Sequence, residues 1–173
     1  GRGEADVLIG TQMIAKGHDY PNVTVAGILS ADLMLGTGDF RAGERAFQLI
    51  TQAAGRAGRG TEAGKVYIQA YNTDDYAVQT ACKQEYEAFY RQEIVFRRTQ
   101  GYPPFGVIGL VTLLSSDASK AAVAAAETSH RIRETCAATQ GLEGISVSDP
   151  AKAPVYRLRD RYRWRLVVRA LRE

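Results

Sequence analysis

The sequence predicts an α/β fold, in which a parallel layer of strands and helices is followed by a smaller α+β domain. Two patterns indicate this class. Apolar runs alternate with a helical stretch in the first 72 residues, and a strand, an Ala-rich helix and another extended segment follow a proline break at residues 103–104. A hydrophobic content of 45% over 173 residues is enough for one large core or two small ones.

Three apolar runs in the first part of the chain are predicted to be strands, namely residues 6–11, 23–29 and 65–71. A helix is expected between the second and the third, over residues 39–58. One long helix is expected next, because apolar residues recur every three or four positions. Thr73 or Asp74 is expected to be its N-cap. Residues 101–104 must end that helix, since proline lacks the backbone N–H and clashes with the preceding turn.

The remainder is expected to form a separate, incomplete α+β domain. It begins with a strand over residues 105–115 and a helix over 117–140 that stops at Gly141, and residues 155–170 then form one strand or two. This order resembles the first part of a β-α-β-β sandwich without its closing elements. The predicted division is therefore 1–72, a connecting helix over 73–102, and the domain over 103–173.

Composition and charge exclude several classes of protein. No apolar run reaches the ~18 residues of a membrane span, and no signal peptide is visible. Cys82 and Cys136 are too few for a disulfide framework or a four-cysteine zinc site, which favours a reducing, cytoplasmic setting. The net charge is +3, but residues 101–173 carry eleven Lys and Arg against seven Asp and Glu, a mild indication of a polyanionic partner. The chain lacks an initiator Met, and we expect it to be part of a longer protein.

The most specific string is a Q-x-x-G-R-x-G-R pattern that begins at Gln52. On a helix, Gln52, Arg56 and Arg59 share one face, and their amide and guanidinium groups form a set of donors suited to phosphate oxygens. Gly55 and Gly58 each cost roughly 1 kcal/mol of helix propensity relative to Ala, which indicates close approach of a ligand or another backbone. The alternative is a solvated basic end of a core helix.

A second string, residues 10–21, begins where the first predicted strand ends, which is where open α/β sheets bind ligands. Thr11 can donate its hydroxyl to a phosphate, Gly17 allows close backbone approach, and Asp19 can accept from a ligand hydroxyl. Taken by itself, this string is only a strand-to-loop connection in which Asp19 serves as a cap.

Together, the two strings resemble motifs V and VI of superfamily 2 helicases, and their order and separation resemble the later half of the second, RecA-like motor lobe. Further strings resemble the bacterial replication-restart helicases of this superfamily: Ala31-Asp32, Asp39-Phe40-Arg41-Ala42, Glu44-Arg45, Phe47-Gln48-Leu49, Gly101-Tyr102-Pro103-Pro104-Phe105-Gly106 and Arg161-Tyr162-Arg163-Trp164. The resemblance therefore spans nearly the whole chain.

The resemblance implies ATP and Mg²⁺ as cofactors of the parent protein. Arg56 and Arg59 would be arginine fingers that stabilise charge on the γ-phosphate, with Gln52 beside that phosphate. Gly17 and Asp19 would face the nucleotide and couple it to closure of the motor lobes. The parent would move 3′-to-5′ on single-stranded DNA, with primosome proteins and single-stranded-DNA-binding protein as partners and no membrane.

The resemblance also implies DNA contacts, with a backbone phosphate at Thr11 and branched DNA on the C-terminal domain. Five arginines alternate near the C-terminus, at Arg157, Arg159, Arg161, Arg163 and Arg165. On one β-strand they would line a single face, opposite an apolar face that covers the Ala-rich helix. Guanidinium groups bind phosphate bidentately, which favours contact with a nucleic-acid backbone, and the alternative is a solvated sheet face. Tyr162 and Trp164 are expected to pack in the core rather than to stack on bases.

Several features of the parent are missing from the sequence. It contains no G-x-x-x-x-G-K-[ST] loop and no Asp-Glu dipeptide, so we expect no ATP hydrolysis by this chain alone. The zinc-binding cysteines of the family are also absent, and His18 and His130 have no metal-ligand spacing, so no metal site is predicted. The alternative function is a non-catalytic module that binds nucleic acid or a partner and retains a degenerate motor lobe.

Overall fold

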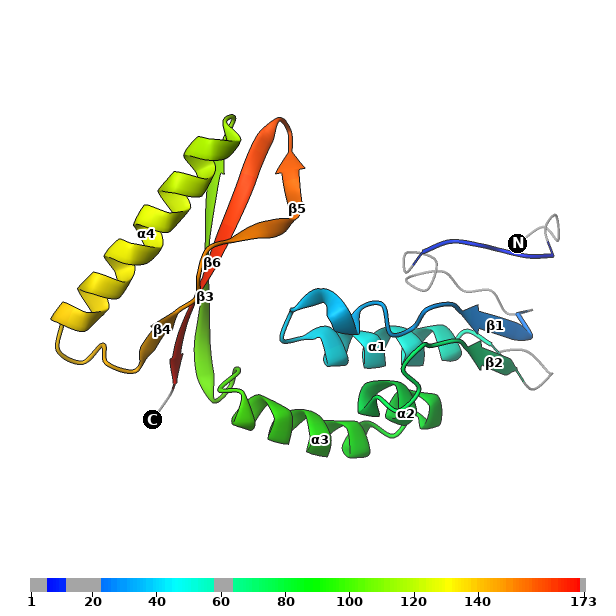
Figure 1. The fold of residues 1–173 in the computed structure, drawn as a ribbon. Helices are drawn as coiled ribbons and strands as arrows, with labels where there is room; N and C mark the ends of the chain where they lie inside the picture. Colours follow the sequence, from blue (N-terminus) through cyan, green and yellow to red (C-terminus); the bar gives the residue numbers. More distant parts are fainter. Residues whose placement is uncertain (1–5, 12–22, 58–63, 172–173) are drawn as a thin grey trace. The chain divides into compact units, whose positions relative to one another are not determined.

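The computed structural model describes residues 6–11, 23–57 and 64–171 (Figure 1). The chain divides into two compact units, residues 1–96 and residues 97–173, and each is described by itself. Both units combine helices with a sheet, so the predicted mixed α/β class is confirmed. In the described part of the chain, no helix is long and apolar enough to cross a membrane.

The first unit contains a small parallel sheet. Its strands, β1 (Val25–Ile28) and β2 (Lys65–Ile68), pair in register from Val25 opposite Lys65 to Ile28 opposite Ile68. A 3₁₀ turn, η1 (Leu35–Thr37), and helix α1 (Ala42–Ala54) lie between them in sequence. The predicted order of strand, helix and parallel strand is therefore confirmed, with each element shorter than expected.

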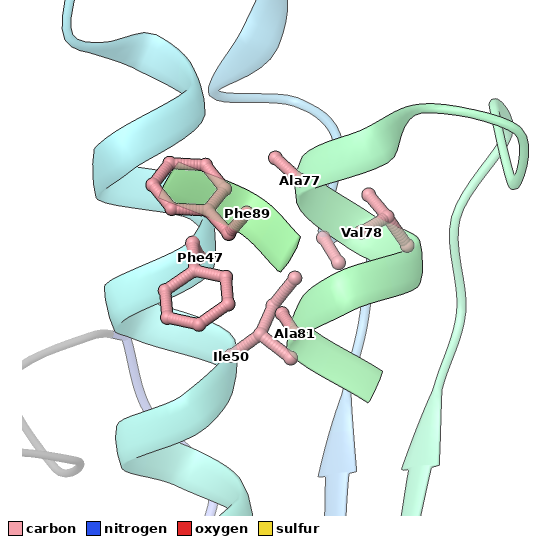
Figure 2. Close-up of a cluster of buried hydrophobic side chains, with 7 residues drawn as sticks. Phe47, Ile50, Ala77, Val78, Ala81 and Phe89 are labelled. Carbon is pink, nitrogen blue, oxygen red and sulfur yellow. The ribbon is translucent and has the colours of Figure 1, made fainter. Parts of the chain in front are cut away.

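The core of this unit lies where α1 meets the next two helices, α2 (Tyr76–Lys83) and α3 (Tyr86–Thr99). Apolar side chains on α1 recur every three or four residues, so Phe47 and Ile50 point to the same side of the helix. Figure 2 shows them with Ala77, Val78 and Ala81 of α2 and with Phe89 of α3. The rings of Phe47 and Phe89 stack with centroids 4.5 Å apart. This packing fixes the helix that carries the Q-x-x-G-R string.

Three expectations for this unit were wrong. The predicted long helix is two helices, because Gln84 adopts a left-handed conformation with φ of 57° and interrupts the hydrogen-bond ladder. Its N-cap is Asp75, which accepts a hydrogen bond from the Ala77 N–H at 2.8 Å, rather than Thr73 or Asp74. Residues 6–11 are not a buried strand, and Ile9 is 88% exposed. A strand needs a hydrogen-bonded neighbour, and the described part of this unit provides none for this run.

The second unit is an antiparallel sheet with one helix. It consists of β3 (Gly106–Ser115), α4 (Ala118–Ala138), β4 (Ile145–Val147), β5 (Ala151–Leu158) and β6 (Arg161–Leu171). Strand β6 is central: β3 pairs along one of its edges, and β4 and β5 pair with successive parts of the other. The expected strand–helix–strand order is confirmed, and residues 155–170 belong to two strands rather than one.

One face of this sheet packs against α4, which contacts β3, β4 and β6. Leu166 of β6 is fully buried, as are Ala121 and Ala125, which lie four residues apart on α4. Asp117 N-caps the helix by accepting from the Ser119 N–H at 2.8 Å and the Lys120 N–H at 2.9 Å. The other face of the sheet carries no helix in the described part of the unit.

Candidate nucleotide and nucleic-acid sites

The Q-x-x-G-R string lies at the C-terminal end of α1. Gln52 is exposed on the last turn, and the Gly55 N–H donates to the Thr51 carbonyl at 3.0 Å. The Gly55 bond spans four residues, as in an α-helix, whereas the Arg56 N–H donates to the Ala53 carbonyl, only three residues back. The α-helix therefore ends at Ala54, and Arg56 lies half-buried in the following turn rather than on one helix face with Gln52. Arg59 lies outside the described residues.

Gly55 was expected to mark a close approach. A β-carbon at this position would lie 3.4 Å from the Thr51 carbonyl oxygen and 3.6 Å from that of Gln52, which are ordinary contacts. Its φ of −68° is accessible to any residue. The described structure therefore gives no steric reason for glycine here, and an approach by a ligand stays a prediction.

The second string is described only at its start. Thr11 is exposed at the end of the described segment 6–11, while Gly17 and Asp19 lie outside the described residues.

Asp32 joins the segments that leave the two parallel strands, a role that the sequence analysis did not assign to it. Its Oδ2 atom accepts from the backbone N–H of Tyr71 at 2.9 Å and of Asn72 at 2.7 Å. Beside it, the Ser30 N–H donates to the side-chain oxygen of Gln69 at 2.6 Å. These contacts fix the carboxyl edge of the sheet, where ligands bind in open α/β folds. The available signal was a carboxylate placed a few residues beyond an apolar run.

The N–H of Asn72, with a smaller contribution from Tyr71, holds the pKa of Asp32 below its ordinary value. A lowered pKa in the folded state gives stability that is present above about pH 4 and is lost as the pH falls through the folded-state pKa. We therefore expect Asp32→Asn to lower the melting temperature at pH 7 and to reduce its dependence on pH between about pH 4 and pH 2. Thermal melts across that range, with Asp74→Asn as the control, provide the measurement. If the melting temperature of the Asp32→Asn variant fell with pH as steeply as that of the unsubstituted chain, this role would be contradicted.

The five alternating arginines do not share a face, contrary to expectation. Arg159 and Asp160 form a two-residue turn, with φ of 50° and 56°, that joins β5 to β6. Across this turn Leu158 pairs with Arg161, and Arg157 pairs with Tyr162. Directly paired residues of antiparallel strands point to the same face, so an odd position on β5 shares a face with an even position on β6. Arg157 therefore lies on the face of Tyr162, and Arg159 lies at the tip.

Three of the five remain together on β6. Side chains alternate between the two faces of β6, and Leu166 is buried on one of them. The opposite face carries four arginines, which we call the arginine row: Arg161, Arg163, Arg165 and Arg169. In the described part of the chain no carboxylate pairs with Arg161, Arg163 or Arg165. The row lies on the sheet face away from α4 and offers guanidinium groups to an anion.

Apolar side chains of the neighbouring strands flank the row. Leu114 of β3 is directly opposite Arg163 and is 52% exposed. A hollow at this end of the sheet is lined by Leu114, Leu158, Arg159, Arg161 and Arg163. The face thus combines cations with exposed apolar surface, as expected for a surface that contacts another molecule.

Comparison with known proteins shows what this chain is similar to. Residues 98–173 match the family described as Primosomal protein N C-terminal domain. Over all 173 residues, the chain is 44% identical to the replication restart protein PriA of Bacillus subtilis (strain 168). The chain belongs to the PriA family. It is also 38% identical over 170 residues, 97% of its length, to PriA of Synechocystis sp.. A third relative, PriA of Chlamydia pneumoniae, is 53% identical over 103 residues, 60% of the chain and 14% of that relative.

The chain spans 21% of the length of the Bacillus subtilis PriA and 20% of that of Synechocystis. For this PriA-family chain, the described structure brings the arginine row together on one surface and places Gln52 and Arg56 at the end of one helix. Thr11 and Arg56 belong to the first unit, and Arg157 belongs to the second. The roles of all these residues in binding ATP or DNA are therefore matters for a proposal.

Proposed function

We propose that this chain contributes part of the second motor lobe and a DNA-binding C-terminal domain to an ATP-dependent 3′-to-5′ DNA helicase that restarts replication. The observation that carries the proposal is the 44% identity to a replication restart protein over the full length of the chain. The parallel pairing of β1 with β2, with α1 between them in sequence, supports a RecA-like lobe.

In this proposal the end of α1 faces the nucleotide. Arg56 and Arg59 stabilise the negative charge that develops on the γ-phosphate of Mg²⁺-bound ATP, and Gln52 donates a hydrogen bond beside them. Their amide and guanidinium groups suit phosphate oxygens, and α1 is fixed by the core around Phe47 and Ile50. Gly17 and Asp19 face the same nucleotide from the other string.

The DNA contacts are proposed on both units. Thr11 donates its hydroxyl to a backbone phosphate of the single strand on which the motor moves. The arginine row contacts phosphates of branched DNA, since Arg161, Arg163 and Arg165 have no carboxylate partner among the described residues and the row lies on a face that no described helix covers. Primosome proteins and single-stranded-DNA-binding protein are the proposed partners of the longer protein.

The chain does not fit the zinc that the family resemblance implies for its parent. Cys82 belongs to the first unit and Cys136 to the second, and the described residues contain no cluster of three His, Cys, Asp or Glu side chains. We therefore assign no zinc ligand and no step of the reaction to zinc in this chain.

The isolated chain is expected to bind DNA without hydrolysing ATP, because arginine fingers act on a nucleotide that other groups must hold. The measurement is phosphate release by the purified chain with and without single-stranded DNA, beside a DNA-binding titration. DNA-stimulated turnover in a homogeneous sample would contradict this division of roles. Absence of DNA binding would contradict the DNA-binding half of the proposal.

A further inference from the structure

The face of the β5–β6 hairpin opposite the arginine row carries three aromatic side chains in contact. The ring centroid of Tyr156 lies 5.3 Å from that of Tyr162 and 6.4 Å from that of Trp164. We call Tyr156, Tyr162 and Trp164 the aromatic cluster. All three side chains are only partly buried, whereas Leu166, on the same face of β6, is fully buried. The cluster therefore lies at the margin of the core, on the face where Tyr162 and Trp164 were expected to pack.

An irregularity in β5 builds this cluster. The pairing shifts between Lys152, opposite Trp164, and Arg157, opposite Tyr162, so five steps along β5 correspond to two along β6. In regular alternation the neighbours Tyr156 and Arg157 would point to opposite faces of the sheet. The bulge instead lets Tyr156 reach the rings of Tyr162 and Trp164, as bulges do where they re-aim a side chain.

Two cations flank the rings. The Lys152 ammonium lies 4.9 Å from the centroid of Tyr156, and the Arg157 guanidinium lies 5.4 Å from that of Tyr162. Both of these side chains are exposed. Arg157 also pairs with the exposed Asp160 carboxylate at 2.9 Å, and a DNA phosphate would replace that carboxylate as its partner. The ring of Tyr156 is tilted by 55° against that of Tyr162 and by 81° against that of Trp164, so the cluster offers separate ring faces bordered by cations. Such a set matches nucleotides, whose bases stack on rings and whose phosphates pair with ammonium or guanidinium groups.

We propose that the aromatic cluster binds single-stranded DNA by stacking unpaired bases on Tyr156 and Tyr162, with Lys152 and Arg157 on the adjoining phosphates. The inference rests on the proposed DNA-binding function and deepens it. In duplex DNA the bases are already stacked on one another, so only an unpaired strand can use these rings. The hairpin then has two DNA-binding faces, one that contacts bases and one, the arginine row, that contacts phosphates.

The test compares two oligonucleotides with the same backbone charge. One is a 15-nucleotide oligothymidylate, and the other is an abasic strand of equal length. The complete 173-residue chain is expected to bind the oligothymidylate about tenfold more tightly or better, since each stacked base contributes independently of the phosphates. Trp164 is the single tryptophan, so its fluorescence should be quenched by the oligothymidylate and much less by the abasic strand.

Substitutions separate stacking from folding. Tyr156→Leu with Tyr162→Leu should bring the two affinities within about twofold of each other, while Tyr156→Phe with Tyr162→Phe should keep the preference. Retained binding of the abasic strand and an unchanged melting temperature show that the leucine variant is folded. Tyr67→Leu with Tyr71→Leu, at tyrosines that are 63% and 83% exposed in the first unit, is the matched control and should leave the preference unchanged.

Four outcomes would overturn the inference. Equal affinity of the unsubstituted chain for both strands would exclude base stacking while leaving phosphate binding, and hence the proposed function, intact. A preference that survives in the folded leucine variant would place stacking elsewhere. Binding to neither strand would overturn the proposed DNA-binding function together with this inference. If the chain dimerises through the cluster instead, the leucine variant will lose the dimer, and a second copy of the chain is the occupant.

Discussion

Replacing Arg59 with alanine, in a full-length PriA-family protein that contains this chain, is expected to lower ATP hydrolysis by about 10³-fold or more. Nucleotide binding is expected to change little. The physical reason is that a guanidinium group placed on the γ-phosphate interacts most strongly when negative charge develops there, in the transition state. An interaction that strengthens only in the transition state contributes to kcat and hardly at all to the binding of ATP.

Steady-state ATPase measurements and a separate nucleotide-binding titration check this prediction. Arg91, exposed on α3, provides a matched control, because Arg91→Ala removes the same charge without touching the Q-x-x-G-R string. ATP hydrolysis by the Arg59→Ala protein within about tenfold of the unsubstituted protein would show that the finger assignment is wrong. A loss of affinity for ATP as large as the loss of rate would assign Arg59 to ground-state binding instead.

The second unit was predictable from the sequence because its local signals agree with its packing. The Ala-rich helix has an aspartate N-cap at Asp117, and its small residues at 121 and 125 pack on the sheet. The apolar run that forms β3 pairs along its whole length with β6, so both sequence pattern and sheet neighbour favour the same strand. Where the sequence pattern and the packing partner favour the same element, the residue types alone are enough to predict it.

The faces of the arginines could not be predicted because one turn decides them. Arg159 and Asp160 both adopt positive φ, although neither is a glycine or asparagine, so the sequence carries no strong turn signal. A two-residue turn pairs position 158 with 161, and this exchanges the faces of odd and even positions between the strands. Counting odd residues through the turn therefore placed Arg157 on the wrong side of the sheet.

In the first unit, the local sequence pattern was not enough to predict elements that depend on residues distant in sequence. Residues 6–11 are as apolar as a buried strand, but a strand also requires a neighbour, and Ile9 is 88% exposed. The helix break at Gln84 contains no glycine or proline, so the sequence does not indicate it. Asp32 acquires its role only through the backbone amides of Tyr71 and Asn72, about forty residues further along the chain. Family resemblance, confirmed by the comparisons, supplied the roles of Gln52 and Arg56, and these roles stay predictions.

The largest effect expected in the second unit is on the salt dependence of DNA binding. Each phosphate contact adds about 0.9 to the slope of log K against log salt for duplex DNA. Arg161→Gln with Arg163→Gln should therefore lower that slope by about 1.8 and should weaken binding to all sequences alike. We choose this pair because both arginines lie on the arginine row, whereas Arg159 lies in the turn. Glutamine keeps a polar side chain that can donate hydrogen bonds, and it removes the charge.

Lys120→Gln with Arg131→Gln provides the control, because it removes two positive charges from exposed positions on α4, the helix on the opposite face of the sheet. If the arginine row contacts phosphates, the control variant keeps the original slope, and both variants keep the original melting temperature. An equal loss of slope in the two variants would mean that net charge alone attracts the DNA. An unchanged slope in the Arg161 and Arg163 variant would leave these side chains as a solvated sheet face, because released counterions report phosphate contacts directly.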